Sequence, residues 1–126
     1  MTHTIIYNPE THIIETKVQG NIALDEMKEI FSEAMQIAIE KEVFLFLSDF
    51  REATISLSTM NIYDLPKILS DTAAPLGGNV HKFKRAIVTA KDFKDSGFSE
   101  TVTVNRGQNA KFFHDVDEAK KWLSEK

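Results

Sequence analysis

The chain contains no cysteine, an absence that removes several chemical classes at once. Without thiols, it has no disulfides, thiol nucleophiles, iron–sulfur clusters or cysteine-based zinc sites. The four histidines, His3, His12, His81 and His114, are scattered and never recur at the three- or four-residue spacing of helical metal ligands. We therefore expect exposed or strand-edge histidines, no metal site and no cofactor.

Long apolar runs and an excess of basic residues are also missing. No segment approaches the roughly 20 apolar residues that span a bilayer, and residues 1–10 carry no basic stretch before an apolar one. Lys and Arg number 15 against 19 Asp and Glu, a formal charge of -4 that disfavours nucleic acid as a partner. The one short basic cluster, His81–Arg85, is expected to be a solvated strand flank. We expect a cytoplasmic protein without membrane insertion or nucleic-acid binding.

Catalytic and nucleotide-binding motifs are absent as well. The glycine pair in Pro75–Asn79 does not follow a predicted strand and lacks the Gly-Lys-Ser/Thr of a phosphate-binding loop. There is no Gly-x-Ser-x-Gly elbow and no Gly-x-Gly-x-x-Gly fingerprint. An enzyme that uses Asp49 as an acid and Arg51 as a cation is a hypothesis without a supporting motif, so we expect the chain not to be an enzyme.

What the sequence does contain is a clear order of strands and helices. Thr4–Tyr7 is a short apolar strand, and the alternating segment His12–Gly20 predicts the second arm of a hairpin that ends at Gly20. Apolar residues at steps of three and four predict a helix over Leu24–Glu40. Val43–Leu47 is apolar on both alternating faces, as is typical of a central strand covered by helices on each side.

The second half of the chain repeats this alternation. Met60–Leu69 is expected to be helical but interrupted at Pro66, and Arg85–Ala90 is expected to be another buried strand. A third helix is predicted from about Asp92 or Ser96 to Arg106, a last strand at 110–113, and a final helix capped by Asp115 with Glu118 completing a capping box. Residues 1–126 thus form a single α/β domain, β-β-α-β-α-β-α-β-α, with a mostly parallel five-stranded sheet and helices on both faces.

The stretch Asp49–Thr59 is rich in charged and hydroxyl side chains and follows the predicted central strand. In open α/β sheets, ligand sites gather at the carboxyl ends of the strands. Ser58 or Thr59 is the natural N-cap of the next helix, which is the structural explanation of its hydroxyl. Asp49 is expected to accept hydrogen bonds from local N–H groups, and Arg51 to pair with Glu52 or Asp64. The functional interpretation is that a hydroxyl here is modified or recognised by a partner.

The chain resembles the SpoIIAA-like fold of STAS domains, which include the anti-sigma-factor antagonists, and more narrowly the uncharacterised SpoIIAA-like proteins of bacteria. The resemblance covers essentially the whole chain. It rests on an Asp-x-Arg-x-Ala segment after the central strand and on a closing pattern, carried by Asp49, Arg51 and Ala53 and by Asn105, Arg106, Gly107, Phe113, Glu118, Ala119, Trp122 and Leu123.

The resemblance implies a non-enzymatic regulatory domain with a protein partner. In anti-sigma-factor antagonists, a serine in an Asp-Ser-Ser-Gly motif at this helix start is phosphorylated to switch binding. This chain has hydroxyls there but not that motif, and the nearest positions are Ser58 and Thr59. The candidate regulatory or interaction residues are Asp49, Arg51, Ser56, Ser58 and Thr59.

The wider fold neighbourhood includes CRAL-TRIO lipid-carrying domains, which gives an alternative function. A small apolar ligand would then lie between the second and third helices, against Met60, Ile62, Leu65, Phe93 and Phe98. The competing interpretation assigns these residues to the core or to an interface between two copies in a homodimer. We favour core or interface, since 126 residues leave little room for a cavity beneath a sheet covered on both faces.

Overall fold

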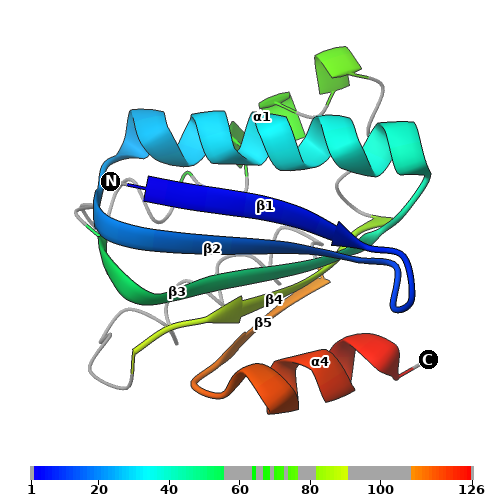
Figure 1. Cartoon of the computed structure of the whole chain (residues 1–126). Helices are drawn as coiled ribbons and strands as arrows, with labels where there is room; N and C mark the ends of the chain where they lie inside the picture. Colours follow the sequence, from blue (N-terminus) through cyan, green and yellow to red (C-terminus); the bar gives the residue numbers. More distant parts are fainter. Residues whose placement is uncertain are drawn as a thin grey trace.

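The computed structural model describes residues 2–55, 64, 67–68, 70–72, 74–76, 82–90 and 109–125. These residues build a five-stranded sheet in the order β1-β2-β3-β4-β5 (Figure 1). The outer strand β1 pairs antiparallel with β2, and β2 to β5 pair in parallel, which confirms the mixed, mostly parallel sheet. The bounds of the strands are β1 Thr2–Asn8, β2 Ile13–Ile22, β3 Leu45–Ile55, β4 Lys84–Val88 and β5 Asn109–Phe113.

Helices lie on both faces of this sheet, as expected. Helix α1 (Leu24–Lys41) crosses one face, and α4 (Val116–Ser124) lies on the opposite face (Figure 1). A short 3-10 helix, η1 (Ala74–Leu76), contacts α1. Part of the predicted second helix, Met60–Leu69, is helical at Asp64 and Lys67–Ile68, and Ser70–Thr72 beyond its predicted end are helical as well. The predicted third helix and Pro66 lie outside the described residues, and no described helix is long and apolar enough to cross a membrane.

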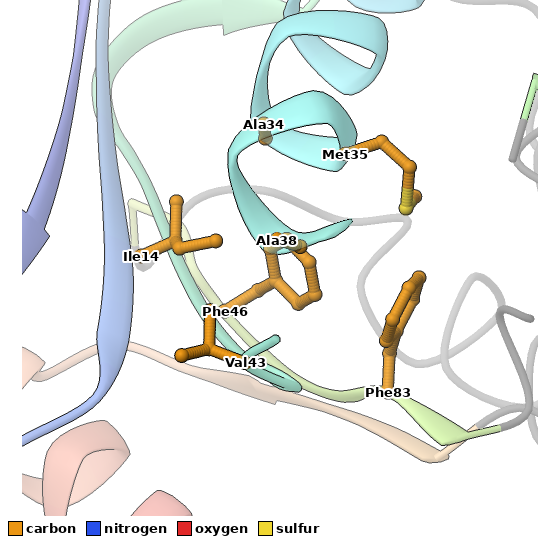
Figure 2. Packing of buried hydrophobic residues seen from close by; sticks show 7 residues of the cluster. All are labelled: Ile14, Ala34, Met35, Ala38, Val43, Phe46 and Phe83. Carbon is orange, nitrogen blue, oxygen red and sulfur yellow. The ribbon is translucent and has the colours of Figure 1, made fainter. Parts of the chain in front are cut away.

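The core beneath α1 is built from the apolar stripe of that helix. Met27, Ile30, Ala34, Met35 and Ala38 are buried along it, at the three- and four-residue steps of a helix. The part near the helix end packs on strands β2 and β3 and on the residue before β4, as Figure 2 shows for Ile14, Ala34, Met35, Ala38, Val43, Phe46 and Phe83. A neighbouring cluster of Val18, Ile22, Met27, Ile30 and Phe50 extends the same layer.

The core beneath α4 uses the opposite faces of the same strands. Ala119 and Leu123 of α4 pack with Ile13, Leu47, Ala86 and Val88. In β2 the alternation is as predicted, because Ile14 and Val18 point toward α1 while Ile13 points toward α4. The sheet therefore separates two apolar layers, one for each helix.

Strand β3 is longer than the sequence analysis predicted. It begins at Leu45 and ends at Ile55, so the segment from Asp49 to Ile55 is strand and not a loop. The physical reason is pairing: β2 continues beside it, with Gln19 to Ile22 opposite Glu52 to Ile55. The prediction that β2 ends at Gly20 was wrong for the same reason. Gly20 lies inside β2 and has a φ of 89°, which glycine adopts without steric cost. It follows closely on a shift in the pairing register with β3, which lies between Lys17 and Gln19.

Two local predictions near α4 also need correction. Asp115 is the N-cap residue of α4, but its side chain forms no capping hydrogen bond, so the predicted capping box is not made. The basic cluster His81–Arg85 is a solvated flank only at Lys82 among its described residues, because Lys84 and Arg85 belong to β4 itself and are partly buried. Phe83 is buried, and Lys84 Nζ donates hydrogen bonds to the carbonyl oxygens of Trp122 (2.5 Å) and Glu125 (2.9 Å) at the end of α4. Burial lowers the pKa of Arg85 to about 10.

Candidate functional site

Three strands end or lose a neighbour at the same edge of the sheet. Strand β4 ends at Val88, opposite Asp49 of β3, and β5 ends at Phe113, opposite Val88. Beyond this point, among the described strands, β3 pairs only with β2. Asp49 and the residues that follow β4 and β5 therefore lie along one edge, the carboxyl ends of the parallel strands, where α/β folds place their ligand sites.

Asp49 and Arg51 form the most tightly connected pair at this edge. Asp49 Oδ1 accepts hydrogen bonds from the backbone N–H of Arg51 (3.1 Å) and from its Nε (3.0 Å). Asp49 Oδ2 accepts a third from Arg51 Nη2 (2.9 Å). The two-pronged geometry fixes the orientation of the guanidinium. The Asp49 side chain is 13% exposed and that of Arg51 is 44% exposed, so the carboxylate is enclosed and the cation faces outward.

The pKa of Asp49 is lowered and the pKa of Arg51 is raised by their contact. Burial opposes ionisation of Asp49, but the hydrogen bonds from the side chain and backbone of Arg51, with the charges of Arg51 and Lys17, hold the pKa of Asp49 below its ordinary value. The hydrogen bond and the charge of Asp49 raise the pKa of Arg51, and the charges of Asp115 and Glu52 add more weakly to this effect. Asp49 is thus a carboxylate at neutral pH, unlike a general acid, which needs a raised pKa.

Two hydrogen bonds join the ends of β4 and β5, one between backbone groups and one from the side chain of His114. The Thr89 N–H donates to the carbonyl oxygen of Phe113 (2.9 Å), and His114 Nδ1 lies 3.2 Å from the carbonyl oxygen of Thr89. At that distance Nδ1 carries the hydrogen and donates it to the carbonyl. His114 therefore holds the strand ends together, and this ring nitrogen is not directed at a nucleophile.

A second polar cluster, formed by Lys17, Gln19 and Glu52, lies on the β2 side of the edge. Lys17 is in register with Asp49, and its Nζ lies 3.4 Å from Glu52 Oε2. Gln19 Nε2 donates to the same Glu52 oxygen at 2.7 Å. The prediction that Arg51 pairs with a neighbour such as Glu52 or Asp64 was wrong. Arg51 pairs with Asp49, and Glu52 instead contacts Lys17 and Gln19. The expected role of Asp49 as an acceptor for local N–H groups is confirmed by its bond to the Arg51 backbone.

The structure brings together the two predicted site residues that it describes, Asp49 and Arg51. The other candidates lie outside the described residues, namely Ser56, Ser58, Thr59, Met60, Ile62, Leu65, Phe93 and Phe98. Sequence reasoning missed Lys17, because its place beside Asp49 follows from the parallel register of β2 and β3 and leaves no local signal. Among the described residues, no group of three His, Asp or Glu side chains is arranged to hold a metal ion.

Comparison with known families places this edge in a wider context. A family model described as SpoIIAA-like matches residues 13–124. The chain belongs to the SpoIIAA-like family. The match spans β2 to the end of α4 and thus includes the whole edge around Asp49 and Arg51. No curated protein is similar enough to this SpoIIAA-like chain to count as a relative.

Two solved structures share the SpoIIAA-like fold. One is an uncharacterised protein of the DUF3478 family with a SpoIIAA-like fold from Shewanella loihica PV-4, with 20% identity, a TM-score of 0.59, and coverage of 97% of this chain and 92% of that one. The other is the anti-sigma factor antagonist SpoIIAA in its unphosphorylated form, with 9% identity, a TM-score of 0.52, and coverage of 93% and 92%. Neither supports the alternative of a lipid carrier.

Proposed function

We propose that this SpoIIAA-like protein is a non-enzymatic regulatory domain of the bacterial cytoplasm that binds another protein through the edge formed by Asp49, Arg51 and the hydroxyl residues that follow β3. One observation carries the proposal. The Asp49 carboxylate is enclosed and accepts three hydrogen bonds from Arg51, while the Arg51 side chain that it orients is 44% exposed at the open end of the sheet. A fixed, outward-facing guanidinium is a group that protein partners recognise well.

The chemistry of the edge supports binding more than catalysis. The pKa of Asp49 is lowered, and His114 donates Nδ1–H to a backbone carbonyl. Acid–base catalysis uses groups whose pKa lies near the working pH and that reach a reacting atom. The family membership agrees with a regulatory role, since the related SpoIIAA structure is that of an anti-sigma factor antagonist.

Regulation by phosphorylation is part of the proposal. Ser56 follows directly after the last residue of β3, and Ser58 and Thr59 follow Leu57 in the sequence. A phosphate on one of these hydroxyls adds close to two negative charges and three strong acceptors. It would compete with Asp49 for the Arg51 guanidinium, which uses only two of its five N–H donors on Asp49. Binding of the partner would then change with the charge at this edge.

A pull-down from the native cell extract tests the proposal. The bait is wild-type protein, Arg51→Gln, Ser58→Asp or Thr59→Asp. Ser124→Asp serves as the matched control, because Ser124 is an exposed residue at the end of α4. We expect Arg51→Gln and at least one of the two acidic variants to lose a partner that wild type and Ser124→Asp both bind, or to bind one that neither of them binds. Identical partners for all five baits would contradict the proposal.

A further inference from the structure

A groove between the outer strand β1 and helix α1 lies apart from the edge around Asp49. Its volume is about 370 Å³, and it is lined by His3, Ile5, Glu33, Gln36, Ile37 and Glu40. Strand β1 and helix α1 run side by side (Figure 1). Two contacts align them: His3 Nε2 lies 2.9 Å from Glu33 Oε2, and Lys41 Nζ lies 5.8 Å from the centre of the Tyr7 ring. These contacts link the two walls of the groove.

One wall of the groove is the edge of the sheet. In the described part of the chain, β1 pairs only with β2, and no strand pairs with its outer side. In an antiparallel pair, alternate residues direct their N–H and C=O groups away from the partner strand. Such edges are usually protected by proline, lysine or a bulge. Thr2–Asn8 contains neither proline nor lysine, and its pairing with β2 has no register shift.

The other wall is acidic. Helix α1 carries five acidic residues and two basic ones, and Glu33 and Glu40 line the groove itself. Glu33 and Glu40 are seven residues apart, which is about 10 Å along a helix axis. Side chains on one face of a strand recur about every 7 Å. Two long basic side chains at neighbouring same-face positions of a strand beside β1 could therefore reach both carboxylates.

We propose that an extended peptide segment of a partner protein adds to the outer edge of β1 as a sixth strand. Its backbone would pair with β1, and alternate Lys or Arg side chains would enter the groove and meet Glu33 and Glu40. The remaining side chains would lie on the opposite face beside Ile6, which is 62% exposed, and are therefore apolar. This mode, strand addition between a sheet edge and a helix, takes its affinity from the main chain and its specificity from alternate side chains. The surface is distinct from the Asp49 edge and does not depend on the function proposed for it.

The probe for the test is an acetylated and amidated peptide of about eight residues that alternates Lys and Val, a length typical of one strand. Fluorescence anisotropy with a labelled peptide measures affinity, and 15N-resolved NMR locates the bound surface. We expect the amide signals of β1 and of Glu33–Glu40 to shift and the outward amides of β1 to exchange more slowly with solvent. The Glu33→Gln/Glu40→Gln double variant should bind about five- to tenfold more weakly, as expected for the loss of two exposed ion pairs.

Three controls separate strand addition from non-specific attraction. Glu10→Gln removes an exposed carboxylate in the β1–β2 loop, and we expect it to leave the affinity unchanged. A peptide with Glu in place of Lys should not bind. A Lys–Val peptide N-methylated at every residue keeps its charge but has no backbone N–H left to donate to β1, and it should also fail to bind. The proposal is overturned if the methylated peptide binds as well as the parent, or if Glu10→Gln weakens binding as much as the double variant does.

Discussion

At the scale of single residues, Asp49 is a carboxylate whose ionised form is favoured by the fold. The side chain is largely enclosed and accepts three hydrogen bonds from Arg51. Because its pKa is lowered in the folded state, its stabilising contribution is fully present above the ordinary value of 3.8, which applies to the unfolded chain. It is lost as the pH falls through the lower folded value. We predict that Asp49→Asn lowers the free energy of unfolding by about 1 kcal/mol at pH 7.

Urea unfolding at pH 7 and at about pH 3 measures this contribution. The difference between wild type and Asp49→Asn should shrink at the lower pH, since pH 3 lies below the pKa of the carboxyl in the unfolded chain, which is then mostly protonated. Glu10→Gln is the control for removal of a surface carboxylate and should give little difference at either pH. An Asp49→Asn effect of equal size at both pH values would show that the charge of Asp49 contributes nothing to stability.

At the scale of elements, α4 is held at its C-terminal end by a residue from another element. Lys84 Nζ at the start of β4 donates to two carbonyl oxygens there and lies 4.5 Å from the centre of the Trp122 ring. Helix ends leave carbonyl groups without partners inside the helix, and a cation at that end also favours the helix dipole. Lys84→Ala should therefore destabilise the protein by about 1–2 kcal/mol and increase hydrogen exchange of α4 amides before those of α1.

Lys82→Ala is the matched control, because Lys82 is exposed and two residues away. It should change neither the stability nor the exchange of α4. If Lys84→Ala raised exchange equally in α1 and α4, the effect of Lys84 would be global and not a cap on one helix.

The elements also show what the sequence could and could not predict. The stripe of α1 and the alternation of β2 were read correctly, because periodic burial leaves a periodic pattern. The second half of β3 was missed, since Asp49, Arg51 and Glu52 have the composition of a loop. The available signal was Phe50, buried four residues after Phe46 on the α1 face. The pairing of Arg51 with Asp49 instead of Glu52 depends on which side of the strand each side chain leaves, which composition does not encode.

At the scale of the molecule, the sheet divides two apolar layers that share the same strands. Met35 lies in the layer under α1, and Leu123 lies in the layer under α4. The two layers meet in β3, whose Phe46 faces α1 and whose Leu47 faces α4. A strand cannot lose its packing on one face and keep its backbone pairing intact, so we expect the layers to unfold together.

The single tryptophan allows this cooperativity to be measured. Trp122 lies on α4 with its ring centre 5.7 Å from that of Phe113, so its fluorescence reports the α4 layer, whereas far-UV circular dichroism reports the whole chain. Met35→Ala should lower the free energy of unfolding by about 3 kcal/mol and shift both transitions to the same urea concentration, although Met35 is on the opposite face. Ile39→Ala, on an exposed position of the same helix, should cost less than about 1 kcal/mol. A fluorescence transition that stays in place while the dichroism transition moves would mean that the α4 layer folds independently of α1.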